Sequence, residues 1–301
     1  MSVIPPPINR RPLERALHAL DAGTFVKVIC GIGSRKARRI RNLAAIYASA
    51  GAHAIDMAPH IDVVEAVQAG VEWAAGHSAP EGSRPLLMVS LGTGDDPHVG
   101  IPLLDLAVCA TCQHCWCEVE KWCATRPLEV RHPECPSCMA CLRACPFDAI
   151  SLVQPGLGNP ALLMELMRRG VQAVELHISG APKTEFMELW RAIAPLLSPD
   201  HLVSFSVGSS VSSDQLLREH LDIVHALGHE HVVFQAEGRP MSGARHDSDS
   251  AGASLELARW IRNHNGGSHV QASGGCDLTT GARAQSMGVD LSGIGFGSFA
   301  R

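Results

Sequence analysis

Residues 269–297 read HVQASGGCDLTTGARAQSMGVDLSGIGFG and contain two short apolar stretches separated by a helical stretch. The pattern predicts strands at His269–Ser273 and Leu291–Phe296 and a helix at Thr280–Met287. Two strands joined through a helix are typical of parallel neighbours in one sheet, because a parallel pair needs a crossover connection. This unit therefore predicts an α/β protein.

The same alternation of strand and helix extends toward the N-terminus. The six further predicted strands are Phe25–Gly31, Ala54–Ala58, Leu86–Leu91, Ala173–Ile178, Leu202–Val207 and Val232–Ala236. The other predicted helices are Pro12–Leu20, Arg35–Ala50, Ile61–Ala75, Ala161–Arg169, Glu185–Leu197, Ser213–Leu227 and Ser254–His264. Eight β/α units in 301 residues predict a TIM-type (β/α)8 barrel. An open doubly wound sheet is the alternative fold.

A cysteine-rich segment interrupts this pattern after the third strand, and we interpret it as a ferredoxin-like insert. Its second half has the spacing Cys135-x-x-Cys138-x-x-Cys141-x-x-x-Cys145-Pro146, the run with which bacterial ferredoxins bind [4Fe–4S] clusters. The upstream group consists of Cys109, Cys112, Cys115, Cys117 and Cys123. A zinc ribbon would have two well-separated CxxC pairs, and disulfides would need an oxidising compartment, so both fit less well.

The nine cysteines predict two [4Fe–4S] clusters with crossed ligation. Cys135, Cys138, Cys141 and Cys123 would bind one cluster. Three of the upstream cysteines and Cys145 would bind the other, with Cys117 as the candidate for the spare thiol. The predicted domains are residues 1–98 and 156–301 for the two parts of the barrel, and 99–155 for the insert.

The alternation of apolar and polar residues in the strands predicts a polar barrel interior. If the apolar set faces the helices, Lys27, Asp56, Glu175, His177 and Glu237 face inward. Other predicted inward side chains are Ser90, Ser204, Ser206, Gln235, Gln271 and Ser273. Buried charges are costly unless they pair or bind a ligand, so the five ionisable residues and Arg239 at the rim are candidate catalytic residues. The alternative is a buried polar network that only packs.

Glycines follow the last two predicted strands and suggest a cofactor site. Gly274, Gly275, Gly295 and Gly297 lie where the backbone of many barrels approaches a phosphate group. FMN or another phosphate-bearing ligand is therefore expected, with tight turns as the alternative explanation.

The composition limits the partners. A net charge of −5 argues against general nucleic-acid binding. The N-terminal residues resemble no signal peptide, and no apolar run reaches the ~18–20 residues of a membrane span. We therefore expect a cytoplasmic protein without a membrane span, and the polar interior of the barrel suggests a small-molecule ligand.

Three stretches resemble one known family. The stretches are residues 28–31 (Val-Ile-Cys-Gly), 87–91 (Leu-Met-Val-Ser-Leu) with 95–98 (Asp-Asp-Pro-His), and 237–243 (Glu-Gly-Arg-Pro-Met-Ser-Gly). Together with the cysteine run they are similar to the LdpA family of light-dependent period modulators. These are iron–sulfur proteins of cyanobacteria linked to redox input of the circadian clock. The resemblance implies redox sensing or electron transfer and signalling partners. The alternative function is a ferredoxin-coupled reductase with a substrate, phosphate ligand or flavin in the barrel mouth.

Overall fold

The fold is a closed barrel, described by a computed structural model for residues 9–30, 37–93, 101–110, 140–153, 159–208, 212–238, 249–264 and 267–297. Eight parallel strands hydrogen-bond in the order β1-β10-β9-β8-β7-β6-β3-β2. Their bounds are β1 Phe25–Ile29, β2 Ala54–Met57, β3 Leu86–Gly92, β6 Ala173–His177, β7 Leu202–Gly208, β8 Val232–Glu237, β9 His269–Ser273 and β10 Gly293–Phe296. The ring closes because β1 pairs with both β2 and β10. The predicted barrel is confirmed, and the open sheet is wrong.

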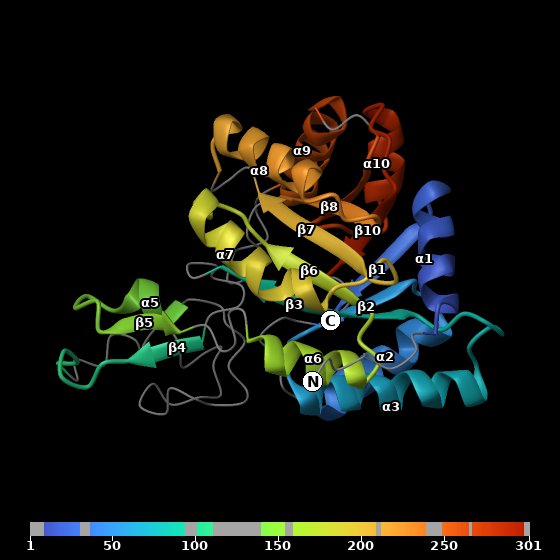
Figure 1. The fold of residues 1–301 in the computed structure, drawn as a ribbon, viewed down its shortest axis with the longest axis horizontal. Coiled ribbons are helices and arrows are strands. Elements are labelled where there is room, and N and C mark those ends of the chain that lie inside the picture. The colour runs from blue at the N-terminus through green and yellow to red at the C-terminus, as the bar shows by residue number, and fades with distance from the viewer. Residues whose placement is uncertain are drawn as a thin grey trace.

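Helices surround this barrel (Figure 1). They are α1 Arg11–Asp21, α2 Ala37–Ser49, α3 Ile61–His77, α6 Pro160–Arg168, α7 Lys183–Ile193, α8 Asp214–Leu227, α9 Ser250–His264 and α10 Thr280–Ser286. The predicted helix Glu185–Leu197 is too long: α7 ends at Ile193, and a 3-10 turn covers Ala194–Leu196. Pro195 explains the change, since proline cannot donate the backbone hydrogen bond that an α-helix needs.

Two layers of apolar contacts stabilise the fold. The larger core lies between strands and helices, where outward side chains such as Val89, Val174 and Phe205 pack against the surrounding helices. Helices α2 and α3 approach closely at Gly70, where a Cβ would lie only 2.3 Å from the carbonyl oxygen of Arg41. This contact therefore requires glycine at position 70.

The smaller core lies inside the barrel at the amino ends of the strands. Its members from the strands are Phe25, Ala54, Leu86, Met88, Ala173, Leu202 and Val233. Helix α1 covers this end with Leu13, Ala16, Ala19 and Leu20. This half of the interior, at the amino ends of the strands, is the lower half of the barrel, and it is apolar. The alternation of residues in the strands predicted polar side chains along the whole interior.

The segment between β3 and β6 contains further structure. Strands β4 (Ile101–Leu104) and β5 (Ile150–Val153) form a two-stranded antiparallel sheet, and the short helix α5 (Ala140–Ala144) precedes β5. In Figure 1 these elements lie beyond the end of the barrel toward which the arrows of β6 and β7 point, and α1 lies at the opposite end. The ferredoxin-like character of this segment and the boundaries at 99 and 155 stay predictions.

None of the helices in the described part of the chain combines the length and the apolar character that a membrane crossing requires.

Candidate functional site

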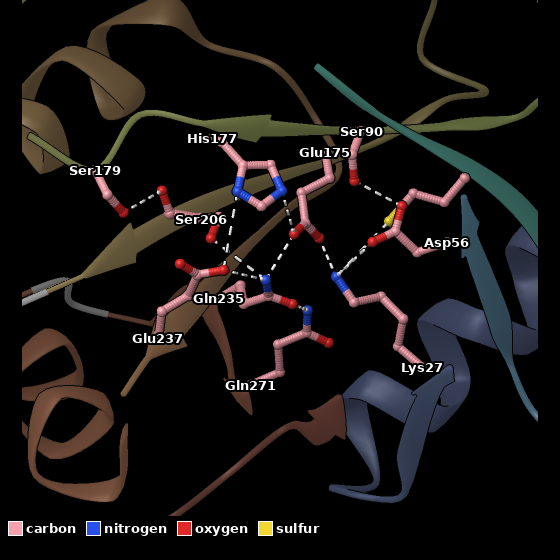
Figure 2. Close-up of polar contacts among 11 residues, drawn as sticks. Lys27, Asp56, Ser90, Glu175, His177, Ser179, Ser206, Gln235, Glu237 and Gln271 are labelled. Carbon is pink, nitrogen blue, oxygen red and sulfur yellow. Dashed lines mark hydrogen bonds and ion pairs between the residues drawn. The ribbon is translucent and has the colours of Figure 1, made fainter. Parts of the chain in front are cut away.

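A layer of polar side chains lies inside the barrel (Figure 2). It lies above the apolar layer, toward the carboxyl ends of the strands. Its members are Lys27 on β1, Asp56 on β2, Ser90 on β3, Glu175 and His177 on β6, Ser204 and Ser206 on β7, Gln235 and Glu237 on β8, and Gln271 on β9. Except for Gln271, which follows His269, each member follows an apolar interior residue or another member by two positions, so these side chains lie on the same face of their strands. The register between the parallel strands places these residues at similar heights in the barrel. Glu175, for example, pairs with Ser90 on one side and with Ser204 on the other.

Lys27 contacts two acids of the polar layer. Its ammonium group forms a close ion pair with Glu175 Oε2, and Asp56 Oδ2 lies 3.8 Å from Nζ. All three side chains are completely buried. Met88 Sδ, 3.9 Å from Nζ, bounds the ammonium on the side of the apolar layer. The positive charge of Lys27 is therefore already balanced within the protein, and little of it remains for an anionic ligand.

The two acids beside Lys27 have opposite pKa shifts. Burial, together with the negative charge of Glu175, raises the pKa of Asp56 to about 7, although Ser90 Oγ donates to Asp56 Oδ1 over 2.7 Å. Burial also acts to raise the pKa of Glu175, but the charges and hydrogen bonds of Lys27 and His177 outweigh it and lower that pKa to about 2. Glu175 is therefore the permanent counter-ion of Lys27, and Asp56 is the acid that changes protonation near neutral pH.

A second group of ionisable residues lies above this ion pair. His177 Nε2 is 3.3 Å from Glu175 Oε1, and His177 Nδ1 is 3.9 Å from Glu237 Oε1. The ligand atoms of Glu175, His177 and Glu237 all lie within 4.8 Å of one another. Glu237 has an exposed side-chain fraction of 18%, and those of His177 and Glu175 are 2% and 0%. The group therefore extends from the buried layer to the carboxyl end of the barrel.

Gln235 connects these acids, a role that the sequence argument missed. Its amide nitrogen donates to Glu175 Oε1 over 2.6 Å and to Glu237 Oε1 over 3.2 Å. Its oxygen accepts from Gln271 Nε2 at 2.9 Å. Both glutamines were predicted to face inward, and the spacing of Gln235 and Glu237 by two residues was the available signal for a shared site.

The glycines after β9 have a clear packing role. Gly274 and Gly275 have φ values of 80° and 81°, which favour glycine. A Cβ at Gly275 would lie 2.7 Å from Cβ of Ser250, the first residue of α9, and Ser250 Oγ donates to the carbonyl oxygen of Gly274. This close approach explains the glycines here, so their role in phosphate binding stays a prediction.

The other two predicted cofactor-binding glycines lie on or after β10. A Cβ at Gly295 would meet Ser273 Oγ at 3.0 Å and Gln235 Oε1 at 3.5 Å, so this residue borders the polar layer. Gly297 lies against Ile29, with 3.9 Å from its Cβ position to Cβ of Ile29. Of these two glycines, Gly295 is the one that borders the polar layer, beside Ser273 and Gln235.

Three of the nine cysteines in the predicted cluster segment lie among the described residues. Cys109 follows β4, Cys141 lies in α5, and Cys145 directly follows α5. The remaining predicted ligands, Cys112, Cys115, Cys117, Cys123, Cys135 and Cys138, lie outside the described residues, as does the candidate catalytic residue Arg239.

The two cysteines elsewhere in the chain are buried against the barrel. Cys30 follows β1 and Cys276 follows β9, with exposed fractions of 2% and 3%. Burial raises the pKa of the Cys276 thiol to about 12, so it stays protonated at neutral pH.

Comparison with known proteins identifies the family. Over 276 residues the chain is 32% identical to Light dependent period A of Synechococcus elongatus, covering 90% of this chain and 76% of that protein. A family model for the light dependent period A C-terminal domain matches residues 165–301.

Solved structures resemble the chain only in their fold. Deoxyribose phosphate aldolase from Aeropyrum pernix is 14% identical, with a TM-score of 0.47 and coverage of 98% of this chain and 95% of that chain. The old yellow enzyme from Trypanosoma cruzi is 8% identical, with a TM-score of 0.47 and coverage of 91% and 84%. Both likenesses concern the fold alone. Because the chain is 32% identical to Light dependent period A over most of both chains, it belongs to the light dependent period A family.

Proposed function

We propose that this chain is an iron–sulfur redox protein in which two [4Fe–4S] clusters lie over the polar end of the barrel and serve redox sensing or electron transfer. Cys135, Cys138, Cys141 and Cys123 would bind one cluster. Cys145 and three of Cys109, Cys112, Cys115 and Cys117 would bind the other. When bound, such clusters supply one-electron chemistry.

The observation that carries the proposal is the register of the β4–β5 sheet. The last pair in this register is Leu104 with Ile150. Cys109 lies five residues after Leu104, and Cys145 lies five residues before Ile150. Because the strands are antiparallel, the chain after β4 and the chain before β5 lie at the same end of the sheet. Thiols from the upstream and downstream groups are therefore directed to one end of the sheet, as crossed ligation requires.

The short helix α5 adds a second downstream thiol at that end. The backbone N–H of Cys145 donates to the carbonyl oxygen of Cys141 over 3.1 Å, so the two residues are one helical turn apart. Residues four apart on a helix lie on the same side of it. In the proposed ligation these neighbouring thiols serve different clusters, which would couple the loss of one cluster to the loss of the other.

The position of the insert relative to the barrel suggests how its redox state could affect the rest of the protein. The described part of the insert lies beyond the carboxyl ends of the strands, the side at which Glu237 and His177 lie in the barrel. A change of charge close to a buried, poorly solvated network has a large effect, because the effective dielectric is low there. We infer that Glu237 and His177 respond to the redox state of the insert, and that a signalling or redox partner binds at this end.

The second candidate is a reductase that uses the same electrons on a substrate. The grouping of Glu175, His177 and Glu237 at the carboxyl end favours it, because barrel enzymes place catalytic groups at this end. In this candidate Glu237, the most exposed of the three, contacts the substrate, and FMN or another phosphate-bearing ligand is the redox cofactor of the barrel.

Anaerobic purification of the full chain tests both candidates. We expect about eight iron and about eight sulfide per chain. Cys145→Ser should lose iron, whereas Cys276→Ser, a matched change of a buried cysteine in the barrel, should retain all of it. Full iron in both variants would refute the ligand assignment. Flavin bands in the absorbance spectrum would favour the reductase, and their absence from protein with intact clusters would favour the sensor.

A further inference from the structure

We propose that the barrel has a site for a divalent first-row transition metal, formed by Glu175, His177 and Glu237 with the side-chain oxygen of Gln235 as a further ligand. This site is separate from the cysteine segment, so it stands or falls independently of the iron–sulfur clusters.

The geometry of the three residues suits one ion. Glu175 and His177 are two positions apart on β6, so both side chains point into the barrel, and Glu237 approaches them from β8 (Figure 2). One oxygen or nitrogen from each residue lies within 4.8 Å of the others. A metal with bonds of about 2.0–2.2 Å can join atoms separated by such distances after small side-chain rotations.

The charge balance of the interior favours a cation. Among the described residues that line the barrel, three carboxylates (Asp56, Glu175 and Glu237) accompany a single ammonium group, that of Lys27. Buried negative charge without a counter-charge is costly, and protonation of Asp56 offsets only part of it. Glu237 is the acid that lies farthest from Lys27 along the chain of contacts. Metal binding requires the imidazole of His177 to be uncharged, and Glu237 then has no counter-charge among the described residues of this layer. A cation beside Glu237 and His177 would neutralise that charge.

The two carboxylate oxygens of Glu175 have different partners, and Oε1 is the one that faces the proposed site. Lys27 contacts Oε2, whereas Oε1 faces His177 and Gln235. Lys27 therefore holds the carboxylate through Oε2 and orients Oε1 toward the proposed site. Such outer contacts orient ligands in many metal centres, and their removal typically weakens metal binding about 10–100-fold.

Gln235 is the one group whose present orientation opposes a cation, and Gln271 provides the remedy. The Gln235 amide nitrogen now donates to both glutamates. Rotation of this amide by half a turn would direct its oxygen at the metal and its nitrogen at Gln271. Gln271 Nε2 now donates to Gln235 Oε1, and Gln271 Oε1 is buried and accepts no hydrogen bond from the described residues. The same rotation of Gln271 would turn Oε1 toward the rotated Gln235 nitrogen, so the hydrogen bond between the two amides would be kept with its direction reversed. The pair can therefore exist in two orientations, one donating to the acids and one binding the metal.

The ligand types select the metal. Two carboxylates, an imidazole and an amide oxygen suit Mn²⁺, Fe²⁺ or Zn²⁺, whereas thiolate-seeking ions would prefer the cysteine segment. Mn²⁺ is the best probe, because its preference for oxygen ligands keeps it away from cysteine.

The experiment is a titration of the full chain as purified, in its oxidised form, with Mn²⁺ after chelation of adventitious metal. Loss of the EPR signal of aqueous Mn²⁺ measures binding. We expect a single saturable site, at least tenfold weaker binding in His177→Gln and Glu237→Gln, and unchanged binding in Glu230→Gln. Glu230 is a matched control, since it lies 4.0 Å from His231 elsewhere on the surface.

The proposal is overturned if the wild-type chain has no saturable site, or if Glu230→Gln weakens binding as much as Glu237→Gln. Should His177→Gln fail to fold, Glu237→Gln decides the matter, because the side chain of Glu237 lies at the edge of the buried layer. A folded Glu237→Gln chain with wild-type affinity for Mn²⁺ would exclude the site. Gln235→Met should also weaken binding, and wild-type affinity in that variant would remove the amide from the set of ligands.

Discussion

The lower and upper halves of the barrel interior have the same backbone geometry and opposite chemistry. Below, Phe25, Leu86 and Leu202 pack against α1 in an apolar layer. Two residues further along β1, Lys27 begins a layer of charges and amides. Both layers are buried to a similar degree, so exposure to water does not distinguish them. The lower layer contributes packing alone, whereas the upper layer contains groups that can exchange protons or bind a ligand.

The largest expected effect concerns the ion pair of the upper layer. Glu175→Gln removes the charge that balances Lys27 and should lower the free energy of unfolding by about 3–5 kcal/mol, because it leaves a buried ammonium with only the more distant Asp56. Urea denaturation in the presence of EDTA measures the loss. The double variant Lys27→Met/Glu175→Gln should recover much of it, and a double variant as unstable as the single one would contradict this explanation.

A somewhat smaller loss is expected in the lower layer. Leu86→Ala creates a cavity among fully buried side chains and should cost about 2–4 kcal/mol in urea denaturation. Its affinity for Mn²⁺ should stay at the wild-type value, because the change lies below the ionisable residues. Weaker Mn²⁺ binding in folded Leu86→Ala would mean that the two layers are not independent.

The pH dependence of stability tests the upper layer more finely. The pKa of Asp56 is raised to about 7 in the folded protein, so the folded state binds an extra proton between about pH 4 and 7. Wild-type stability should therefore fall as the pH rises from 5 to 8, by an amount on the order of 1–3 kcal/mol. Glu175 has the opposite shift and affects stability only as the pH falls from about 4.5 toward 2.

Asp56→Asn should abolish the fall between pH 5 and 8 while preserving the hydrogen bond from Ser90. Urea denaturation with EDTA at both pH values measures it. An equal fall in the variant would assign the titration to another group.

The smallest expected effect concerns two serine hydroxyls of the upper layer, one with and one without a hydrogen bond to a described residue. Ser204 Oγ is buried and makes no hydrogen bond with the described residues, so Ser204→Ala should change stability by less than about 0.5 kcal/mol. Ser90→Ala removes a donor to Asp56 and should cost about 1 kcal/mol or more at pH 8. Equal effects in thermal denaturation would contradict the hydrogen-bond assignment.

The sequence predicted the barrel because strand alternation and helix periodicity repeat eight times with little ambiguity. The inward direction of Lys27, Asp56 and Glu175 followed from the same alternation, since a shift of one residue would have turned these charged side chains toward the apolar helices. Boundaries were less accurate: α9 begins at Ser250, four residues before the predicted start, because its first turn consists of small residues without an apolar stripe.

Other features depend on contacts that no local pattern encodes. The two-stranded β4–β5 sheet was not predicted, because its strands are only four residues long and are separated by the cysteine segment. The interior divides into two layers because the register between neighbouring strands sets the height of each side chain in the barrel. The bridging role of Gln235 likewise depends on the neighbouring strands β6 and β9.

The pairing of β1 with β10 has a consequence for how the protein folds. Phe25 pairs with Gly293, so the first and last strands of the barrel meet across nearly the whole sequence. Contacts between such distant residues form slowly, since a very long loop must close before they contribute. We expect β10 to dock last during synthesis. Until then Lys27 would remain hydrated at an open seam, and the cost of burying its charge would be incurred only in the final step.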